Sequence, residues 1–198
     1  MPRSRDCVKY FCKLMFIDIF WLQKYNKSMK NEMKKELADS IRLFSLPRYE
    51  ELSDVGLYLE QTTKYINQCL APLGCVEITS SMISNYVKKG LVANPVKKQY
   101  FRGQIAHLIC ITLLKSVLSL ENINDLFLRQ KQVYTDETAY DYFCMELENI
   151  LFFQFGLKDE VENIGVTSSL EKEMLQSAII AVSHIIYLNT CFQILREK

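Results

Sequence analysis

A short stretch near the middle of the chain carries hydroxyl, amide and ammonium side chains at helical spacing. Four polar residues follow the i, i+3, i+4, i+7 order of one helical face: Ser81, Ser84, Asn85 and Lys88. Hydroxyl and amide groups can hydrogen-bond to the edges of nucleic-acid bases, and ammonium groups bind phosphates. The spacing therefore predicts a surface that binds a nucleic acid.

The charge of the chain is unevenly distributed along its 198 residues, although the net charge is only +1. Residues 76–102 contain five basic residues and one acidic residue, whereas residues 131–198 contain five basic and eleven acidic residues. A basic segment beside the polar face indicates a polyanionic partner. The alternative is that these lysines form an ordinary solvated surface.

Residue patterns typical of catalysis are absent from the sequence. The two histidines, His107 and His184, each stand alone on an apolar segment, where a histidine is more often a core or surface residue than a ligand. Glu146 and Glu148 fall on different faces of a helix and are not expected to form a catalytic pair. There is no zinc-protease, nucleophile-elbow, phosphate-loop or dinucleotide-binding motif. We therefore expect neither an enzyme nor a cofactor.

The seven cysteines do not follow a spacing that would suggest a disulfide framework or a zinc site. Neither Cys7 with Cys12 nor Cys69 with Cys75 has the CxxC separation. Reduced, buried thiols in a cytoplasmic protein are the expected state.

The polar face requires a helix over residues 79–89. Thr79 stands where an N-cap is expected, and Gly90 stands where a helix end requires a residue able to take positive φ. Ile83, Tyr86 and Val87 share the opposite, apolar face. A helix from Val55 to Leu70, capped by Ser53, is expected to precede it.

A basic loop follows this helix. Asn94 and Pro95 signal a turn, and the segment from Val96 to Tyr100 could form a small β-wing within residues 93–100. The next segment, from Ile105 to Leu120, is almost entirely apolar, which predicts a central core helix.

The arrangement of these elements resembles the winged helix-turn-helix of the MerR-type regulators. The residues that carry this resemblance are Thr79, Ile83, Tyr86, Gly90, Leu91, Lys98, Tyr100, Ile105 and Leu108. More closely, the segments NYVKKGLV, PVKKQY and QIAHLI resemble a bacterial domain-of-unknown-function family, DUF 1836, over about Pro47 to Gln132. One departure is that MerR-type proteins usually carry an arginine in the recognition helix, where this chain has Ser81 and Ser84.

The resemblance implies that helix 79–89 enters the major groove of double-stranded DNA while the wing holds the backbone. The residues expected to contact DNA are Thr79, Ser80, Ser81, Ser84, Asn85, Lys88, Lys97, Lys98, Tyr100 and Arg102. Of these, Asn85 is the most plausible reader of adenine, and the basic residues with Tyr100 are expected to hold phosphates.

We expect three parts along the chain. Residues 1–28 form an N-terminal extension that could derive from an upstream start codon; residues 29–132 form the winged helix-turn-helix domain; residues 133–198 form a helical region for dimerisation or effector binding. In this last region, Thr135 is expected to begin a helix that ends at Gly156, and the S-x-x-E run from Ser168 to Glu171 predicts a capping box.

The C-terminal segment from Met174 to Leu195 contains no charged residue and is long enough to cross a membrane. Its seven polar side chains argue against a lipid-exposed span. A helix buried in the core of one chain or across the axis of a homodimer is the preferred interpretation. The aromatic residues of this region could also line a pocket for a small-molecule effector, although core packing is the simpler explanation.

The sequence therefore predicts a mostly α-helical, cytoplasmic DNA-binding transcriptional regulator that acts as a homodimer, without a metal or a membrane. The alternative is a helical protein-interaction module whose winged head does not bind DNA.

Overall fold

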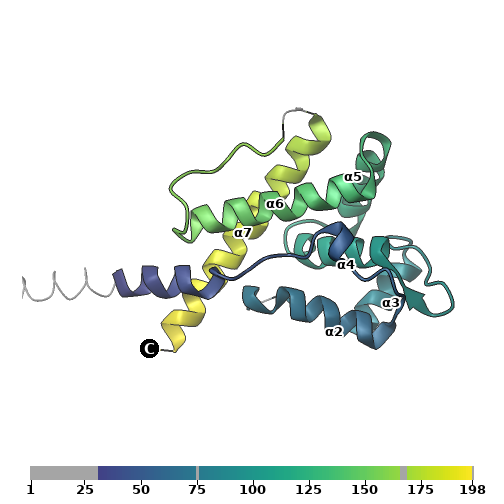
Figure 1. Ribbon diagram of the computed structural model, residues 1–198, viewed down its shortest axis with the longest axis horizontal. Helices are drawn as coiled ribbons and strands as arrows, with labels where there is room; N and C mark the ends of the chain where they lie inside the picture. The colour runs from purple at the N-terminus through teal and green to yellow at the C-terminus, as the bar shows by residue number, and fades with distance from the viewer. Residues whose placement is uncertain (1–30, 75, 166–168, 198) are drawn as a thin grey trace, which may run out of the picture.

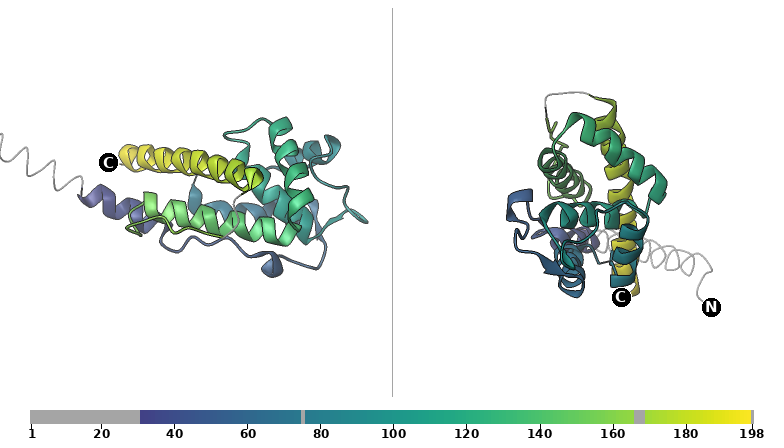
Figure 2. Two further views of the ribbon diagram at one scale, coloured as in Figure 1. Left: turned by 90° about the horizontal axis from the view of Figure 1, so that it is seen from above. Right: turned by 90° about the vertical axis from the view of Figure 1, so that its right-hand side faces the viewer.

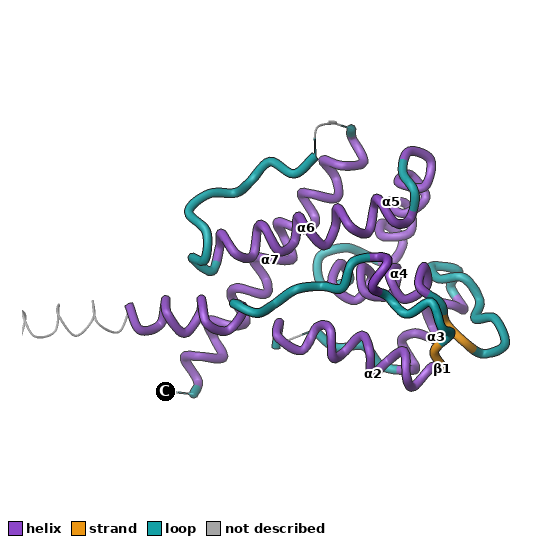
Figure 3. The backbone as a smooth tube through the Cα atoms, viewed as in Figure 1, coloured by secondary structure: helices purple, strands orange, loops and turns teal. Residues whose placement is uncertain are grey.

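The computed structural model describes residues 31–74, 76–165 and 169–197, so the predicted extension over residues 1–28 lies outside the described part of the chain. The described part is mostly helical, as predicted (Figures 1 and 3). A helix over residues 31–41 comes first. The longer helices that follow are α2 (Leu59–Leu70), α3 (Ser80–Lys88), α4 (Arg102–Leu114), α5 (Leu120–Val133), α6 (Asp136–Gln154) and α7 (Leu170–Arg196).

Helix α4 is the centre of the fold, as its apolar sequence predicted. Every residue from Ile105 to Leu114 except His107 is buried. The helix contacts α2 on one side and α5, α6 and α7 on the others, so it needs apolar side chains around most of its circumference. It ends at Leu114, and Ser119 begins α5 by accepting a hydrogen bond from the Asn122 N–H.

Helix α2 begins later than the sequence suggested. The expected start at Val55 and the expected Ser53 cap were wrong, because residues 57–58 form strand β1 (Leu57–Tyr58) before the helix starts at Leu59. Gln61 supplies the cap instead, since its Oε1 accepts the Tyr58 N–H at 2.9 Å. Gly56, just before β1, allows the chain to approach Gln99 closely, because a Cβ at position 56 would lie 2.7 Å from the Gln99 Cβ.

The only sheet in the described residues consists of two short antiparallel strands. Strand β1 pairs with β2 (Gln99–Tyr100), with Leu57 opposite Tyr100 and Tyr58 opposite Gln99. Val96 also bridges to Gln99, so residues 96–99 make a tight hairpin turn that leads into β2. The segment predicted to form a small β-wing therefore supplies one strand, β2, whose partner is β1; it lies at the right-hand end of the molecule in Figure 1.

Helices α6 and α7 pack closely against each other (Figure 2). Thr135 caps α6 by accepting the Thr138 N–H, and Gly156 follows its end with φ of 78°, both as predicted. The N-cap of α7 is Ser169, which accepts the Lys172 N–H, and not Ser168, which lies outside the described residues. Because Ser168 and Ser169 are adjacent, the sequence alone does not determine which hydroxyl caps the helix.

Helix α7 is buried on one side only. Only 28% of the most apolar 18-residue stretch of α7 is buried inside the structure. By length and composition alone, the helix is long and apolar enough to cross a membrane. Large apolar side chains remain exposed along it: Leu170, Met174, Ile180, Leu188, Phe192 and Leu195. The other side packs into the core, where Leu175, Ile179, Val182 and Ile186 are buried.

Two glutamates of α6 are buried, which the sequence did not lead us to expect. Glu148 accepts the Leu46 N–H at 2.9 Å and pairs with the Arg48 guanidinium at 2.6 Å. Glu146 is fully buried and accepts a hydrogen bond from the Gln176 side chain at 2.7 Å. The two carboxylates point to different partners, in agreement with the expectation that they do not form a pair. Glu148 instead ties α6 to the segment that leads from the N-terminal helix to α2.

Candidate nucleic-acid interface

Helix α3 presents the predicted polar face to solvent. Its exposed residues are those that the helical spacing grouped together: Ser81, Ser84, Asn85 and Lys88. On the opposite side, Ile83 and Tyr86 are buried in the core, and Val87 packs against it. Because the helix is anchored through its apolar side, its polar side chains face solvent, although the Ser84 hydroxyl also donates to the Ser80 carbonyl at 2.9 Å.

The orientation of α3 is fixed at its N-terminal end by hydrogen bonds. The Asn67 side chain of α2 donates to the Ile78 carbonyl and accepts the Ile78 N–H, both at 2.9 Å. Thr79 is the N-cap, as predicted, because its Oγ1 accepts the Met82 N–H. These contacts hold α2 and α3 as a helix pair joined by a short connection.

Two residues predicted to contact DNA have structural roles at this end of the helix. The hydroxyl of Ser80 is half-buried and lies 3.0 Å from Thr63 Oγ1 of α2. The Thr79 hydroxyl, although exposed, is occupied by the cap and lies 3.0 Å from the Ser81 hydroxyl. The side chains best placed to meet a partner therefore begin at Ser81.

The tip of the hairpin is formed by two lysines. Lys97 and Lys98 are exposed and have φ of 51° and 67°, a left-handed conformation that is uncommon for residues other than glycine. Positive φ at both central residues is the signature of a type I′ turn, which favours Asn-Gly. The loop before the turn is held by Gln104, whose Nε2 donates to the Ala93 and Asn94 carbonyls. The ammonium groups are thus carried on a well-anchored turn.

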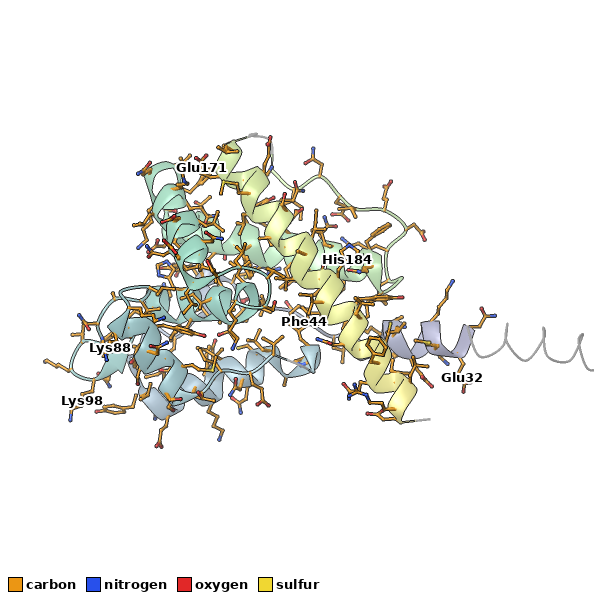
Figure 4. The ribbon with its side chains drawn as sticks, turned by 180° about the vertical axis from the view of Figure 1, so that it is seen from behind. Glu32, Phe44, Lys88, Lys98, Glu171 and His184 are labelled. Atoms are coloured by element: carbon orange, nitrogen blue, oxygen red, sulfur yellow. The ribbon has the colours of Figure 1, made fainter. Side chains whose placement is uncertain are left out.

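The lysines of α3 and of the hairpin lie at the same end of the molecule. Figure 4 shows Lys88 and Lys98 together at one edge, whereas Glu32 of the N-terminal helix lies at the opposite end. Lys89 and Lys97, next to them in sequence, are also exposed. None of these four lysines forms an ion pair with another residue that the structure describes. The arrangement forms a positively charged surface beside the polar face of α3, here called the basic end.

Tyr100 and Arg102, also predicted to contact phosphates, face the protein. Tyr100 is only 4% exposed, and burial raises the pKa of its phenol. Arg102 pairs with Glu50 at 2.9 Å, donates to the Leu52 carbonyl and lies over the Tyr49 ring. Because its charge is offset by Glu50, Arg102 anchors the 49–52 segment to the start of α4.

The partners of Arg102 were not visible in the sequence because Glu50 lies about fifty residues away along the chain. The same holds for Asn67, whose contacts to Ile78 depend on how α2 turns back towards α3. In contrast, the exposed face of α3 followed directly from helical spacing. No group of three or more metal-ligating side chains occurs among the residues that the structure describes.

Comparison with known proteins yields one family. No curated protein and no solved structure matches the chain. The matching family model covers residues 47–143, which includes α2, α3, the hairpin, α4, α5 and the start of α6. The match begins where the resemblance seen in the sequence begins and extends into α6. Residues 47–143 thus match the family described as a domain of unknown function, DUF1836, and support the assignment to that family.

Proposed function

We propose that the protein is a cytoplasmic transcriptional regulator that binds double-stranded DNA through the basic end. The observation that supports this proposal most strongly is the combination of an exposed polar helix face, which ends in Lys88, with a lysine-tipped hairpin at the same end of the molecule. A helix of this size fits the major groove, and a hairpin beside it can contact the backbone.

In this proposal the helix pair α2 and α3, the hairpin and α4 form a MerR-like winged helix-turn-helix, in which α3 is the recognition helix. Ser81, Ser84 and Asn85 face the base edges, and an amide side chain such as that of Asn85 can bind adenine through two hydrogen bonds. Lys88, Lys89, Lys97 and Lys98 bind phosphates. Thr79, Ser80, Tyr100 and Arg102 position these elements.

We also propose that the regulator is a homodimer formed through the exposed side of α7. A single short recognition helix gains affinity and specificity when a two-fold axis presents two copies to two half-sites. The row of exposed apolar side chains on α7, which includes Leu188 and Phe192, gives such an axis a surface to bury.

The proposal is tested by selecting binding sequences from genomic DNA fragments at low salt and then measuring affinity by fluorescence anisotropy. Enrichment of a palindromic sequence is expected. Because phosphate contacts dominate affinity, the double variant Lys88→Glu/Lys98→Glu is expected to lose at least about a hundredfold in affinity for that sequence.

The matched control is Lys34→Glu/Lys35→Glu, which makes the same change in net charge on the exposed part of the N-terminal helix at the opposite end of the molecule. It should retain most of the affinity. Equal loss in both double variants would mean that binding depends on overall charge and not on the basic end.

A second candidate function is supported by the composition of α3. Its exposed face carries no arginine, the side chain most used for specific contacts to guanine. A helical protein-interaction module without DNA binding would need no such residue. The absence of any enriched sequence at low salt would favour this second function.

A further inference from the structure

A cavity lies between α5, α6 and α7, away from the basic end. Its volume is about 290 Å³, at the lower end of the range for sites that hold small molecules. Most of its wall is apolar, made by the side chains of Ala139, Met145, Ile164 and Leu175 together with the Tyr142 ring. A partly open, mostly apolar space of this size fits the apolar body of a small ligand.

One cationic side chain, that of Lys172, is part of this mostly apolar wall. The Lys172 Nζ donates to the Gly165 carbonyl at 2.9 Å and lies 5.3 Å from the centre of the Tyr142 ring. Within the described residues, no carboxylate forms an ion pair with it. An ammonium group has three donors, so Lys172 retains the capacity to bind an anionic group that enters the cavity.

One acidic residue, Asp141, is part of the cavity lining. The Asp141 carboxylate accepts the Tyr49 N–H at 2.8 Å, which connects α6 to the segment before α2. Glu146, which does not line the cavity, accepts the Gln176 amide at 2.7 Å. The face of Tyr142, where a cationic ligand would be attracted, is already occupied by Lys172.

Neutral donors complete the wall. Tyr142 has a buried hydroxyl without a hydrogen-bond partner among the described residues, and burial followed by the charges of Glu146 and Tyr134 raises its pKa to about 12. The phenol therefore stays neutral and adds no negative charge to the wall. Gln130 adds an amide, and the Tyr134 hydroxyl lies 3.2 Å from the Ser169 hydroxyl at the edge of the cavity.

We propose that this cavity binds a small organic carboxylate with an apolar or aromatic body, whose carboxylate pairs with Lys172. The apolar body would occupy the space between Ala139, Met145 and Leu175. The inference stands independently of DNA binding, because it concerns a different part of the molecule and is measured without DNA.

The test uses isothermal titration calorimetry on the full-length chain with three probes of nearly equal shape: phenylacetate, phenylacetamide and phenethylamine. Phenylacetate is expected to bind at least about tenfold more tightly than the neutral amide, because a charge-assisted hydrogen bond is stronger than a neutral one. The amine is expected to bind most weakly.

Two variants locate the site. Lys172→Met keeps most of the length of the side chain without its charge and is expected to reduce phenylacetate binding to the level of the amide. Ala139→Phe fills the cavity and is expected to abolish binding of all three probes; circular dichroism and thermal unfolding confirm that each variant is folded, and Ala139→Leu provides a smaller filling residue. Lys64→Met, on the exposed side of α2, is the matched control and should bind as the unmodified chain does.

Three results would overturn the proposal. The first is tightest binding of phenethylamine, since it would mean that the acidic and aromatic groups select a cation. The second is unchanged phenylacetate binding in Lys172→Met. The third is the absence of binding by any of the three probes up to their solubility limits.

Discussion

Glu148 shows how one side chain can connect distant parts of the chain. Its carboxylate accepts hydrogen bonds from the Leu46 N–H and from the Arg48 guanidinium, about a hundred residues away in sequence. The pairing raises the pKa of Arg48, so the guanidinium remains charged at every relevant pH. The Glu148 side chain is only 12% exposed, so water cannot easily replace these contacts.

We predict that Glu148→Ala lowers the free energy of unfolding by about 2–4 kcal/mol, because it leaves a partly buried guanidinium and a buried N–H without their acceptor. The measurement is urea unfolding followed by circular dichroism. Glu162→Ala is the control: Glu162 pairs with Lys158 at the surface, and its loss should cost less than about 1 kcal/mol. Equal effects would show that the Glu148 contacts do not contribute in the expected way.

The second prediction concerns His107 and the dependence of the free energy of unfolding on pH. Burial lowers the pKa of its imidazole below the ordinary value of about 6.5, although Asp136, 3.7 Å from Nε2, acts in the opposite direction. Below about pH 6.5 the unfolded chain therefore binds a proton more readily than the folded chain. The free energy of unfolding should fall as the pH is lowered from about 7, and should stop falling from this source once the pH is below the folded pKa.

The measurement compares urea midpoints of the unmodified chain and His107→Gln at several pH values between about 5 and 7.5. The variant is expected to show a shallower decline on the acidic side. Parallel curves would mean that His107 does not titrate differently in the folded and unfolded chain.

At the scale of elements, the two lysines of the hairpin are expected to lower the stability of the fold while strengthening DNA binding. Lysine in a left-handed conformation costs roughly 1–2 kcal/mol, and the type I′ turn formed by Lys97 and Lys98 favours Asn-Gly instead. We predict that Lys97→Asn/Lys98→Gly raises the free energy of unfolding by about 1 kcal/mol while weakening DNA binding.

If both lysines contact phosphates, the slope of log affinity against log salt concentration should fall by about two in the double variant. Thermal unfolding and anisotropy titrations at several salt concentrations provide the two measurements. A variant that is more stable and binds DNA equally well would show that the hairpin makes no backbone contact.

At the scale of the whole molecule, α7 remains only partly covered. Leu188 and Phe192 are more than half exposed, although they belong to a helix with no charged residue between Met174 and Leu195. We predict that the protein has the mass of two chains in size-exclusion chromatography with light scattering, and that Leu188→Asp/Phe192→Asp has the mass of one, because two charges on the buried surface of a dimer are strongly unfavourable.

Circular dichroism of the variant should be unchanged, since these side chains face away from the core of the chain. Val55→Asp, at an exposed apolar side chain of the loop before β1, is the control and should retain the dimer mass. A single-chain mass for the unmodified protein at micromolar concentration would contradict the prediction, and recovery of the protein in the membrane fraction would assign the exposed side of α7 to lipid.

The sequence by itself determined the features that depend on neighbouring residues. Helix caps at Thr79 and Thr135, the end of α3 before Gly90 and the exposed side of α3 all follow from side chains within one or two turns of each other. Local backbone geometry and helical periodicity are enough to place them.

Only the tertiary structure decided which charged groups have partners and which surfaces are covered. Arg102 was expected to contact phosphates but is paired with Glu50, and Glu148 is a buried anchor for Arg48. The start of α2 was also set by tertiary contacts, because pairing with β2 holds Leu57 and Tyr58 in an extended strand. In each of these cases the partner lies tens of residues away, so the energy of the contact is not encoded in the local spacing from which sequence predictions are made.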